Sequence, residues 1–578
     1  MDQEAHTKRT MPLQSAPRLR RKRARPQNFL QEHNLLVPCV VILALVILIS
    51  AGLMHELVST ASSHTIDHFP TIEKEGEPPS SRNQQHQESQ GVPPHLQVSP
   101  VLPIFHPIPN QDKLIDDLLH QRKPTIAGIQ AYLQLFVRQL HKSNLQLSND
   151  PHREALTIIK AYFALADEYL TPLDHAYRDQ LLFPVRDDDS LYLSLAAFRE
   201  HLLADTLEMA FTHAKHPERL FVGAVVQNCF GRVDPNDYHS IDPSGLPCKT
   251  GAQVVGKNAQ GRDQTKVSDA PPDMNGIEVF CQKADFQQYC NNGQIRVLYI
   301  HETESLGPAV ARYYASKLWG GETYFMQVDS HLLYADEWDQ KYIDELRVTS
   351  NYPKSVLSSY PPGFQNVHNN VVRETPGARL CRCETRMEDP NPIVRINMGA
   401  SYTGDEPKPT QIPFIAAGFF FVRAEFLQEI PFDPFLPWLF MGEEIALSLR
   451  AWTHGWNIYA PRKNLIAHQY RPGRMGLPKF WGTVNRLFHG RPGNNRLQGP
   501  LIQRVKHMVG YPGSSRKDLE NDERDGNITF VLEEIEHYGY GTQRKWDDYL
   551  EFAHMTFDHE TNAIVCTRNT WCNKGQKD

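Results

Sequence analysis

The stretch IRVLYIHETESLGPAVARYYASKLWGGETYFMQVDSH, residues 295–331, contains two apolar runs separated by a helical pattern. Residues 295–302 and 323–330 are rich in Val, Ile, Leu, Phe and Tyr, whereas residues 307–319 carry apolar side chains at helical spacing. Short, nearly continuous apolar strands that alternate with helices are typical of a parallel sheet covered on both faces. The stretch therefore predicts an α/β fold.

The same alternation begins upstream of this stretch. Residues 190–198 and 219–228 are apolar runs of strand length, and residues 201–214 between them have helical spacing. In open α/β sheets, ligands bind outside the carboxyl ends of the strands. Asp329 and His331 directly follow one predicted strand, so they are candidates for a site at this edge.

Asp329 and His331 are spaced so that both side chains can bind one divalent cation. Mixed oxygen and nitrogen ligands suit Mn²⁺ as well as Mg²⁺. His468 follows the short apolar run in NLIAHQY and is a third candidate ligand. Asp and Ser are also common turn residues. The Asp-x-His pattern recurs at Asp150/His152 and Asp237/His239, so the pair alone leaves a solvated loop open.

Two adjacent acidic residues, Glu443 and Glu444, follow Gly442 and begin a predicted helix. The inner face of this helix consists of Ile445, Leu449 and Trp452. Acidic residues in a first turn are expected from the helix dipole alone. A catalytic role and this structural explanation both remain open from the residues themselves.

The first hundred residues differ from the rest. A basic segment between Lys8 and Arg25 precedes residues 35–54, LLVPCVVILALVILISAGLM, which carry no charge and are long enough to cross a bilayer. The depth of this run in the chain favours an uncleaved signal anchor over a cleaved signal peptide. The basic residues place the N-terminus in the cytosol. A nuclear signal in RLRRKRAR is the weaker interpretation, because the adjacent span explains the charge.

The cysteines fit a lumenal chain. Eight cysteines lie outside the span, an even number that permits up to four disulfides of undetermined connectivity. Zinc binding by the closely spaced Cys381 and Cys383 is an alternative, but no second pair of ligands at finger spacing accompanies them. Asn527-Ile528-Thr529 is a glycosylation sequon, which is used only in the secretory pathway.

Composition completes the predicted organisation. The net charge of −7 argues against a nucleic-acid partner, and the Pro-, Ser- and Gln-rich segment before residue 110 lacks the apolar content of a core. The predicted parts are a cytosolic tail (1–34), a transmembrane anchor (35–54), a disordered stem (55–110), a helical neck (111–184), a catalytic domain (185–484) and a C-terminal extension or cap (485–578).

Several ordered motifs resemble a known family. These motifs are LYLSLAAFRE, HPERLFVGAVVQN, GPAVARYYASKLWGGETYFMQVDSH, SSYPPGF, AAGFFF, PFDPFLPWLFMGEE, LRAWTHGW and PKFW. In this order, across about residues 188–481, they resemble the polypeptide N-acetylglucosaminyltransferases of glycosyltransferase family 60. The resemblance implies a GT-A fold, UDP-GlcNAc as donor and an α-linkage to a protein hydroxyl, with retention of anomeric configuration.

The resemblance also implies roles for particular residues. Asp329, Ser330 and His331 match the family's Asp-Ser-His motif, which binds the metal that holds the donor diphosphate, and His468 matches a later metal-binding His. Arg312 is expected near the diphosphate or the Asp329 carboxylate. The motif MGEE implies that Glu443 and Glu444 position the sugar or the acceptor. Phe198, Arg199 and Glu200 stand where Tyr-Arg-Asp is usual, which leaves the expected nucleotide contact of Glu200 less secure.

These observations predict a membrane-anchored, Mn²⁺- or Mg²⁺-dependent transferase of the Golgi or ER. It would have a type II orientation and would act on Ser, Thr or hydroxyproline of secretory proteins. Two alternatives remain: the same fold with UDP-GalNAc or UDP-galactose, and an inactive lumenal binding protein. A cytosolic hydroxyproline modifier conflicts with the span and the sequon.

Overall fold

The structure of the protein is a computed structural model. The described residues are 107–242, 248–251, 253–258, 263–364, 367–368, 371–397, 402–404, 406–470, 477–561 and 563–566. The predicted tail and membrane anchor, and the predicted stem up to residue 106, lie outside them. No helix within the described ranges combines the length and the apolar character that crossing a bilayer requires.

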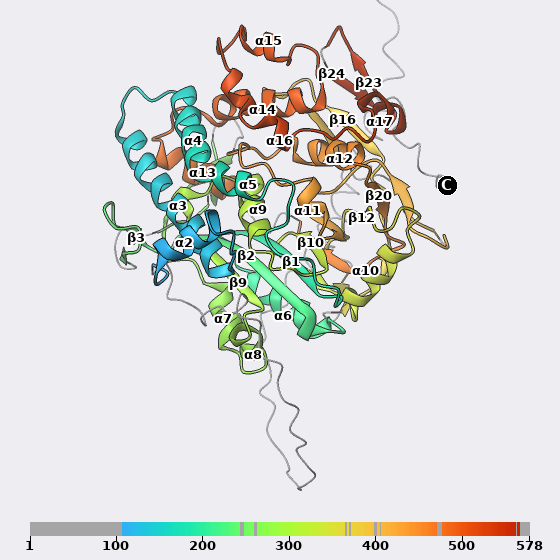
Figure 1. Ribbon diagram of the computed structural model, residues 1–578. Coiled ribbons are helices and arrows are strands. Elements are labelled where there is room, and N and C mark those ends of the chain that lie inside the picture. Colours follow the sequence, from blue (N-terminus) through green and yellow to red (C-terminus); the bar gives the residue numbers. More distant parts are fainter. Residues whose placement is uncertain are drawn as a thin grey trace, which may run out of the picture. The chain divides into compact units, whose positions relative to one another are not determined.

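A central sheet has the strand order β18-β20-β12-β19-β10-β1-β2-β9 (Figure 1). Its parallel half contains β1 (Leu191–Phe198), β2 (Leu220–Asn228), β9 (Ile295–His301) and β10 (Tyr324–Val328). β1 pairs in parallel with β10 and β2, and β2 pairs in parallel with β9. Nearly every residue of these strands is buried, so they form continuous apolar runs. The predicted α/β fold with a mostly parallel sheet is confirmed.

The other half of the sheet is mixed. β19 (Phe419–Arg423) pairs antiparallel with both β10 and β12 (Ser355–Ser358). β20 (Asn457–Ala460) is parallel to β12, and β18 (Thr410–Ile412) forms an antiparallel edge. These antiparallel pairs are compatible with the predicted mostly parallel sheet, and they arise because β19 and β18 run opposite to the strands beside them.

Helices cover the sheet where the sequence predicts them. α6 (Leu203–His213) and α9 (Pro308–Lys317) match the two predicted connecting helices. α9 packs on β1 and β2. The close packing beneath it depends on Gly223 in β2, since a Cβ at this position would lie 1.5 Å from the hydroxyl of Tyr192.

The helices expected between residues 111 and 182 are present. They are α2 (Gln111–Leu119), α3 (Ile126–Asn149), α4 (Ala155–Tyr169) and α5 (Thr171–Ala176). α2, α3 and α4 gather on the β9 side of the sheet (Figure 1). Gln130 donates from Nε2 to the Val297 carbonyl at 2.8 Å, which ties α3 to β9.

Two helices that follow the last strand of the central sheet pack on α12 (Glu443–Thr453). They are α14 (Asn494–Val509) and α17 (Trp546–Phe552). The side chain of Arg504 in α14 is fully buried and donates from Nε to Asp433 at 2.7 Å. Because a lone buried charge is strongly destabilising, this ion pair fixes α14 on the segment before α12.

Shorter elements complete the described structure. The two-stranded ladders are β3 (Arg232–Val233) with β4 (Ile241–Asp242), β5 (Cys248–Lys249) with β8 (Asp269–Ala270), β6 (Gln253–Lys257) with β7 (Asp263–Lys266), β11 (Leu332–Tyr334) with β22 (Ile466–His468), β13 (Val367–His368) with β14 (Val371–Val372), β15 (Thr375–Pro376) with β21 (Lys463–Asn464), β16 (Arg382–Thr385) with β17 (Val394–Asn397), and β23 (Met555–Asp558) with β24 (Ala563–Cys566). The short helices are η2 (Pro217–Arg219), α7 (Gly276–Gln282), α8 (Gln287–Asn291), η3 (Glu302–Glu304), α10 (Trp338–Arg347), α11 (Phe426–Glu429), α15 (Arg516–Leu519), η5 (Thr529–Leu532) and α16 (Ile535–Tyr538).

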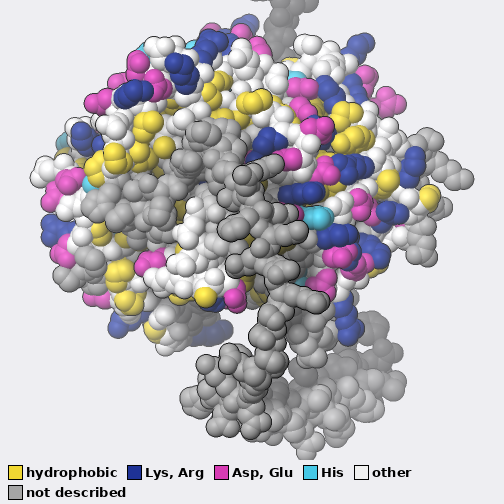
Figure 2. Space-filling model, turned by 60° about the horizontal axis from the view of Figure 1, so that its bottom comes forward, with side chains coloured by type: hydrophobic (Ala, Val, Ile, Leu, Met, Phe, Trp, Pro, Cys, Tyr) yellow, Lys and Arg dark blue, Asp and Glu magenta, His cyan; other side chains and the backbone are white. Residues whose placement is uncertain are grey.

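Three disulfides connect described residues: Cys229–Cys248, Cys281–Cys290 and Cys383–Cys566. The expectation of disulfides is confirmed, and the zinc alternative fails because Cys383 is bonded to Cys566. Asn527 of the sequon is exposed. On the face in Figure 2, basic and acidic side chains intermix over the described residues, which agrees with the small net charge.

Candidate active site

Asp329, His331 and His468 come together at the carboxyl end of β10. Asp329 follows the last residue of β10, and the chain continues into β11 (Leu332–Tyr334). β11 pairs antiparallel with β22 (Ile466–His468), with Leu332 opposite His468. This ladder brings His468 to the cluster from 137 residues further along the chain. Each of the three residues offers a ligand atom within 4.8 Å of the others.

The Asp329 carboxylate is held in its ionised form. His468 Nε2 lies 3.0 Å from Oδ2, and Arg312 Nη2 donates to Oδ1 at 3.2 Å. Burial opposes ionisation. The hydrogen bond and charge of His468 and the charges of Arg312 and His331 outweigh burial, so the pKa of Asp329 lies well below its usual range. An ionised carboxylate is the form that binds a cation.

His331 is oriented by Glu200, which lies just beyond the end of β1. The Nδ1 atom of His331 is 2.9 Å from Glu200 Oε2. The other carboxylate oxygen, Glu200 Oε1, accepts a hydrogen bond from the Leu202 backbone N–H at 2.9 Å. Burial lowers the pKa of His331, but the hydrogen bond with Glu200 and the charges of Asp329 and Glu200 raise it overall. Holding Nδ1 in this way leaves Nε2 for a ligand, the arrangement common among metal-binding histidines.

The antiparallel strand β19 supplies a close approach to Asp329. Gly418, immediately before β19, accepts from the Asp329 backbone at 3.3 Å. A Cβ at Gly418 would lie 3.0 Å from Asp329 Oδ2. The absence of a side chain here therefore leaves the Asp329 carboxylate room to turn toward the cluster.

Arg312 connects the cluster to the acidic start of α12. Its side chain is buried, and Nη1 donates to Glu443 Oε2 while Nη2 donates to Asp329. Burial raises the pKa of Glu443, with Arg312 opposing this effect and the Asp329 charge adding to it. Arg312 thus bridges the carboxylate that follows β10 and the carboxylate that begins α12.

Glu444 occupies a different environment from its neighbour. Its carboxyl accepts from Tyr360 Oη at 2.8 and 2.9 Å and from the Ala417 backbone at 3.0 Å. Burial raises the pKa of Glu444 to about 7, even though both hydrogen bonds favour the ionised form. A carboxyl that changes its protonation near neutral pH is a typical feature of functional sites.

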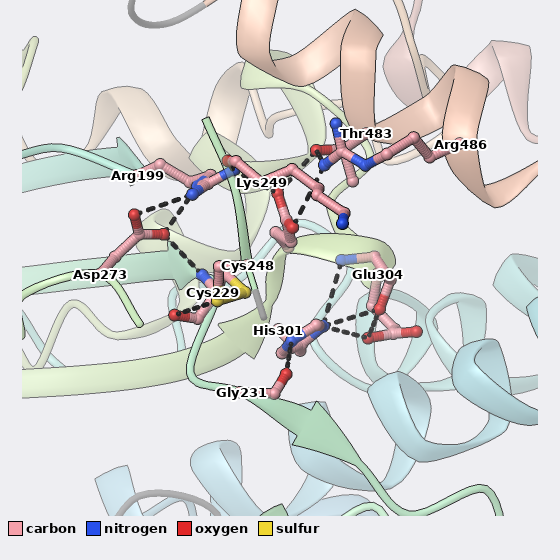
Figure 3. The surroundings of a disulfide bond; sticks show 12 residues. Arg199, Cys229, Gly231, Cys248, Lys249, Asp273, His301, Glu304, Thr483 and Arg486 are labelled. Carbon is pink, nitrogen blue, oxygen red and sulfur yellow. Dashed lines mark hydrogen bonds and ion pairs between the residues drawn. A yellow bond between two sulfur atoms is a disulfide. The ribbon is translucent and has the colours of Figure 1, made fainter. Parts of the chain in front are cut away.

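The remaining predicted residues have partners within the protein. Ser330 donates to the Ala196 carbonyl at 3.3 Å, and the ring of Phe198 packs edge-on against Phe480 with a centroid distance of 5.7 Å. Arg199 donates from Nε to Asp273 at 2.6 Å and from Nη1 to Glu302 and to the Lys249 carbonyl (Figure 3). The nucleotide contacts expected of these residues stay predictions.

Sequence reasoning gave no chemical role to Tyr360, Gly418 or Glu302. Tyr360 and Gly418 do lie in SSYPPGF and AAGFFF, which carried the resemblance, but nothing local to those motifs indicates their contacts with Glu444 and Asp329. Glu302 ends the predicted strand at residues 295–302, and only the fold brings it to Arg199.

One known protein family matches most of the described part of the chain. A family described as Glycosyltransferase (GlcNAc) matches residues 190–559, which is more than half of the chain. The chain belongs to the GlcNAc glycosyltransferase family. This membership confirms the predicted glycosyltransferase class and the predicted resemblance to a GlcNAc-transferase family.

Solved structures give weaker likenesses. This glycosyltransferase is similar to GalNAc-T7, solved with UDP, GalNAc and Mn²⁺, at 14% identity and a TM-score of 0.32, with 60% of this chain and 56% of that chain covered. It is also similar to S. aureus TarS 1-349, solved with UDP-GlcNAc, at 12% identity and a TM-score of 0.26, with 60% and 78% covered. No curated protein sequence matches. Since both TM-scores are below 0.5, the fold assignment depends on the sheet itself.

Proposed function

We propose that this glycosyltransferase is a metal-dependent, retaining enzyme of the GT-A fold. It moves GlcNAc from UDP-GlcNAc to a Ser, Thr or hydroxyproline hydroxyl of secretory-pathway proteins. The single observation that supports this proposal best is the convergence of Asp329, His331 and His468 at the carboxyl end of β10. Family membership supports the transfer of GlcNAc.

The cluster fits a divalent ion of the Mn²⁺ or Mg²⁺ type. It combines one ionised carboxylate with the Nε2 atoms of His331 and His468, and this mixture favours Mn²⁺ over the oxygen-preferring Mg²⁺. When bound, such an ion supplies positive charge to the diphosphate as UDP leaves. His468 Nδ1 is buried with no hydrogen-bond partner among the described residues.

The acidic pair of α12 is proposed to position the reacting groups. Glu443 accepts a hydrogen bond from Arg312, which also donates to Asp329. Glu443 therefore fixes the Arg312 guanidinium beside the donor site. Glu444 has a pKa of about 7, so near neutral pH it can donate a hydrogen bond to a sugar or acceptor oxygen or accept one from a hydroxyl. Both roles act on binding geometry, which is where much of the catalytic gain of transferases arises.

The proposed compartment is the lumen of the Golgi or ER, behind a single N-terminal anchor at residues 35–54. Three disulfides and an exposed Asn527 in a sequon support a lumenal chain. The basic residues between Lys8 and Arg25, ahead of the uncharged run of the predicted anchor, support the type II orientation.

The test is transfer by the full chain. With UDP-GlcNAc, Mn²⁺ and Thr- or Pro-rich peptides, we expect UDP release together with a matching increase in peptide mass. Asp329→Ala should lower the rate by about 100-fold or more, whereas the exposed Asp548→Ala should not change it. Faster transfer from UDP-GalNAc or UDP-galactose would overturn the donor assignment. The absence of transfer from all three donors would favour a lumenal binding protein.

A further inference from the structure

The helix α13 (Leu477–Leu487) lies over the carboxyl ends of two strands. Thr483 Oγ1 donates to Glu302 Oε2 at 2.6 Å, and Arg486 Nη2 donates to Glu302 Oε1 at 3.3 Å (Figure 3). The ring of Phe480 packs against Phe198 at the end of β1. Contacts near both of its ends therefore fix α13, and with it the position of Lys479.

Lys479 is half-buried and lies among charged groups that already have partners. Its ammonium interacts electrostatically with Arg199, Asp273, Glu200 and Glu302. Asp273 accepts from two nitrogens of Arg199 and from the Cys229 backbone. Glu200 and Glu302 likewise accept from donors other than Lys479. In the part of the chain that the structure describes, Lys479 itself has no hydrogen bond or ion pair.

An unpaired ammonium that has lost part of its hydration is unfavourable. Burial lowers the pKa of Lys479, and the charge of Arg199 adds to this effect, while Asp273, Glu200 and Glu302 oppose it. Glu200 is also the residue that holds His331. Phe480, next to Lys479, packs on Phe198, two residues before Glu200, so Lys479 lies at the end of β1, where Glu200 leads to the metal cluster and a donor diphosphate would bring negative charge.

We propose that Lys479 binds the diphosphate of the nucleotide donor. The inference rests on the proposed function and specifies which cation of the chain faces the phosphates. The ammonium donates hydrogen bonds to phosphate oxygens, as lysines do in other phosphate sites. Arg199 does not take this role, since its guanidinium is committed to Asp273, Glu302 and the Lys249 carbonyl.

The test compares UDP with uridine as ligands of the full chain, by titration calorimetry with Mn²⁺ present. Lys479→Met should weaken UDP binding by about 10- to 100-fold, the loss expected for a hydrogen bond to a charged group. Uridine binding should stay unchanged, because uridine has no phosphate. Lys479→Arg should retain most of the UDP affinity. Lys113→Met, at a lysine side chain that is 75% exposed on α2, is the matched control.

The outcomes separate this inference from the proposed function. Wild-type chain that binds no UDP overturns both. Wild-type chain that binds UDP, with Lys479→Met equally tight, overturns this inference alone. A parallel loss of uridine binding in Lys479→Met would also overturn it, by indicating a role in shaping α13. Because Lys479 has no partner to lose, the melting temperature of Lys479→Met without ligand should equal or exceed that of wild type.

Discussion

Replacing Glu444 with glutamine is predicted to stabilise the protein, by an amount that increases with pH. Burial raises the pKa of this carboxyl from its ordinary value of 4.5 to about 7. Between these two pH values the folded protein keeps a proton that the unfolded chain has already released. Stability therefore falls as the pH rises through this window and is lowest above pH 7, where both states are ionised. Glu444→Gln removes this dependence.

The magnitude follows from the two pKa values. One pKa unit is worth about 1.4 kcal/mol, so ionised Glu444 costs the folded protein about 3 kcal/mol at pH 8. Glutamine resembles the protonated acid, since its amide oxygen can accept from the Ala417 backbone and its NH₂ can donate to Tyr360 Oη. We therefore expect Glu444→Gln to match wild type near pH 4.5 and to exceed it by about 3 kcal/mol at pH 8.

Urea unfolding of wild type and Glu444→Gln at pH 5, 6, 7 and 8 measures this difference. All other ionisable groups are common to the two proteins, so their contributions largely cancel. Glu520→Gln, at an exposed helix end, is the control and should follow wild type at every pH. A difference between Glu444→Gln and wild type that does not change with pH would refute the reasoning. Transfer activity should fall in the more stable variant, as expected where a functional group is buried at a cost.

Three further predictions concern the metal cluster. Glu200→Ala frees His331 Nδ1 and should weaken Mn²⁺ binding by about 10- to 100-fold, measured by calorimetry. Gly418→Ala places a methyl group 3.0 Å from Asp329 Oδ2 and should lower Mn²⁺ affinity by about fivefold, with little change in the circular dichroism spectrum. Mn²⁺ at 100 times its dissociation constant should stabilise wild type by about 2.7 kcal/mol, and should leave the melting temperature of Asp329→Asn unchanged.

The parallel half of the fold could be predicted from sequence because burial on both faces leaves a local signal. β1, β2, β9 and β10 are continuous apolar runs, and their boundaries agree with the structure to within two residues. The direction of β19 could not be predicted, since FFFV is equally compatible with either orientation. Direction is set by pairing with β10 and β12, which are distant in the chain.

The same distinction applies to the site. Asp329 and His331 were accessible from sequence because they follow a recognisable strand and are two residues apart. His468 was a third candidate because it follows a short apolar run, but only the β11–β22 ladder brings it to the cluster. Glu200 was expected near the nucleotide, and the structure places its carboxyl on His331. Such contacts depend on which strand ends lie side by side, and the local pattern of the sequence does not contain that information.

The charges of the site favour metal and diphosphate binding together. Asp329 is ionised and Glu443 lies beside it, and one guanidinium, Arg312, contacts both. A divalent ion without diphosphate would add positive charge next to Arg312. A diphosphate without the ion would add negative charge next to Asp329. Each ligand relieves the repulsion that the other meets, so Mn²⁺ should tighten UDP binding, and UDP should tighten Mn²⁺ binding by the same factor. Equal UDP affinity with and without Mn²⁺ would contradict this account of the cluster.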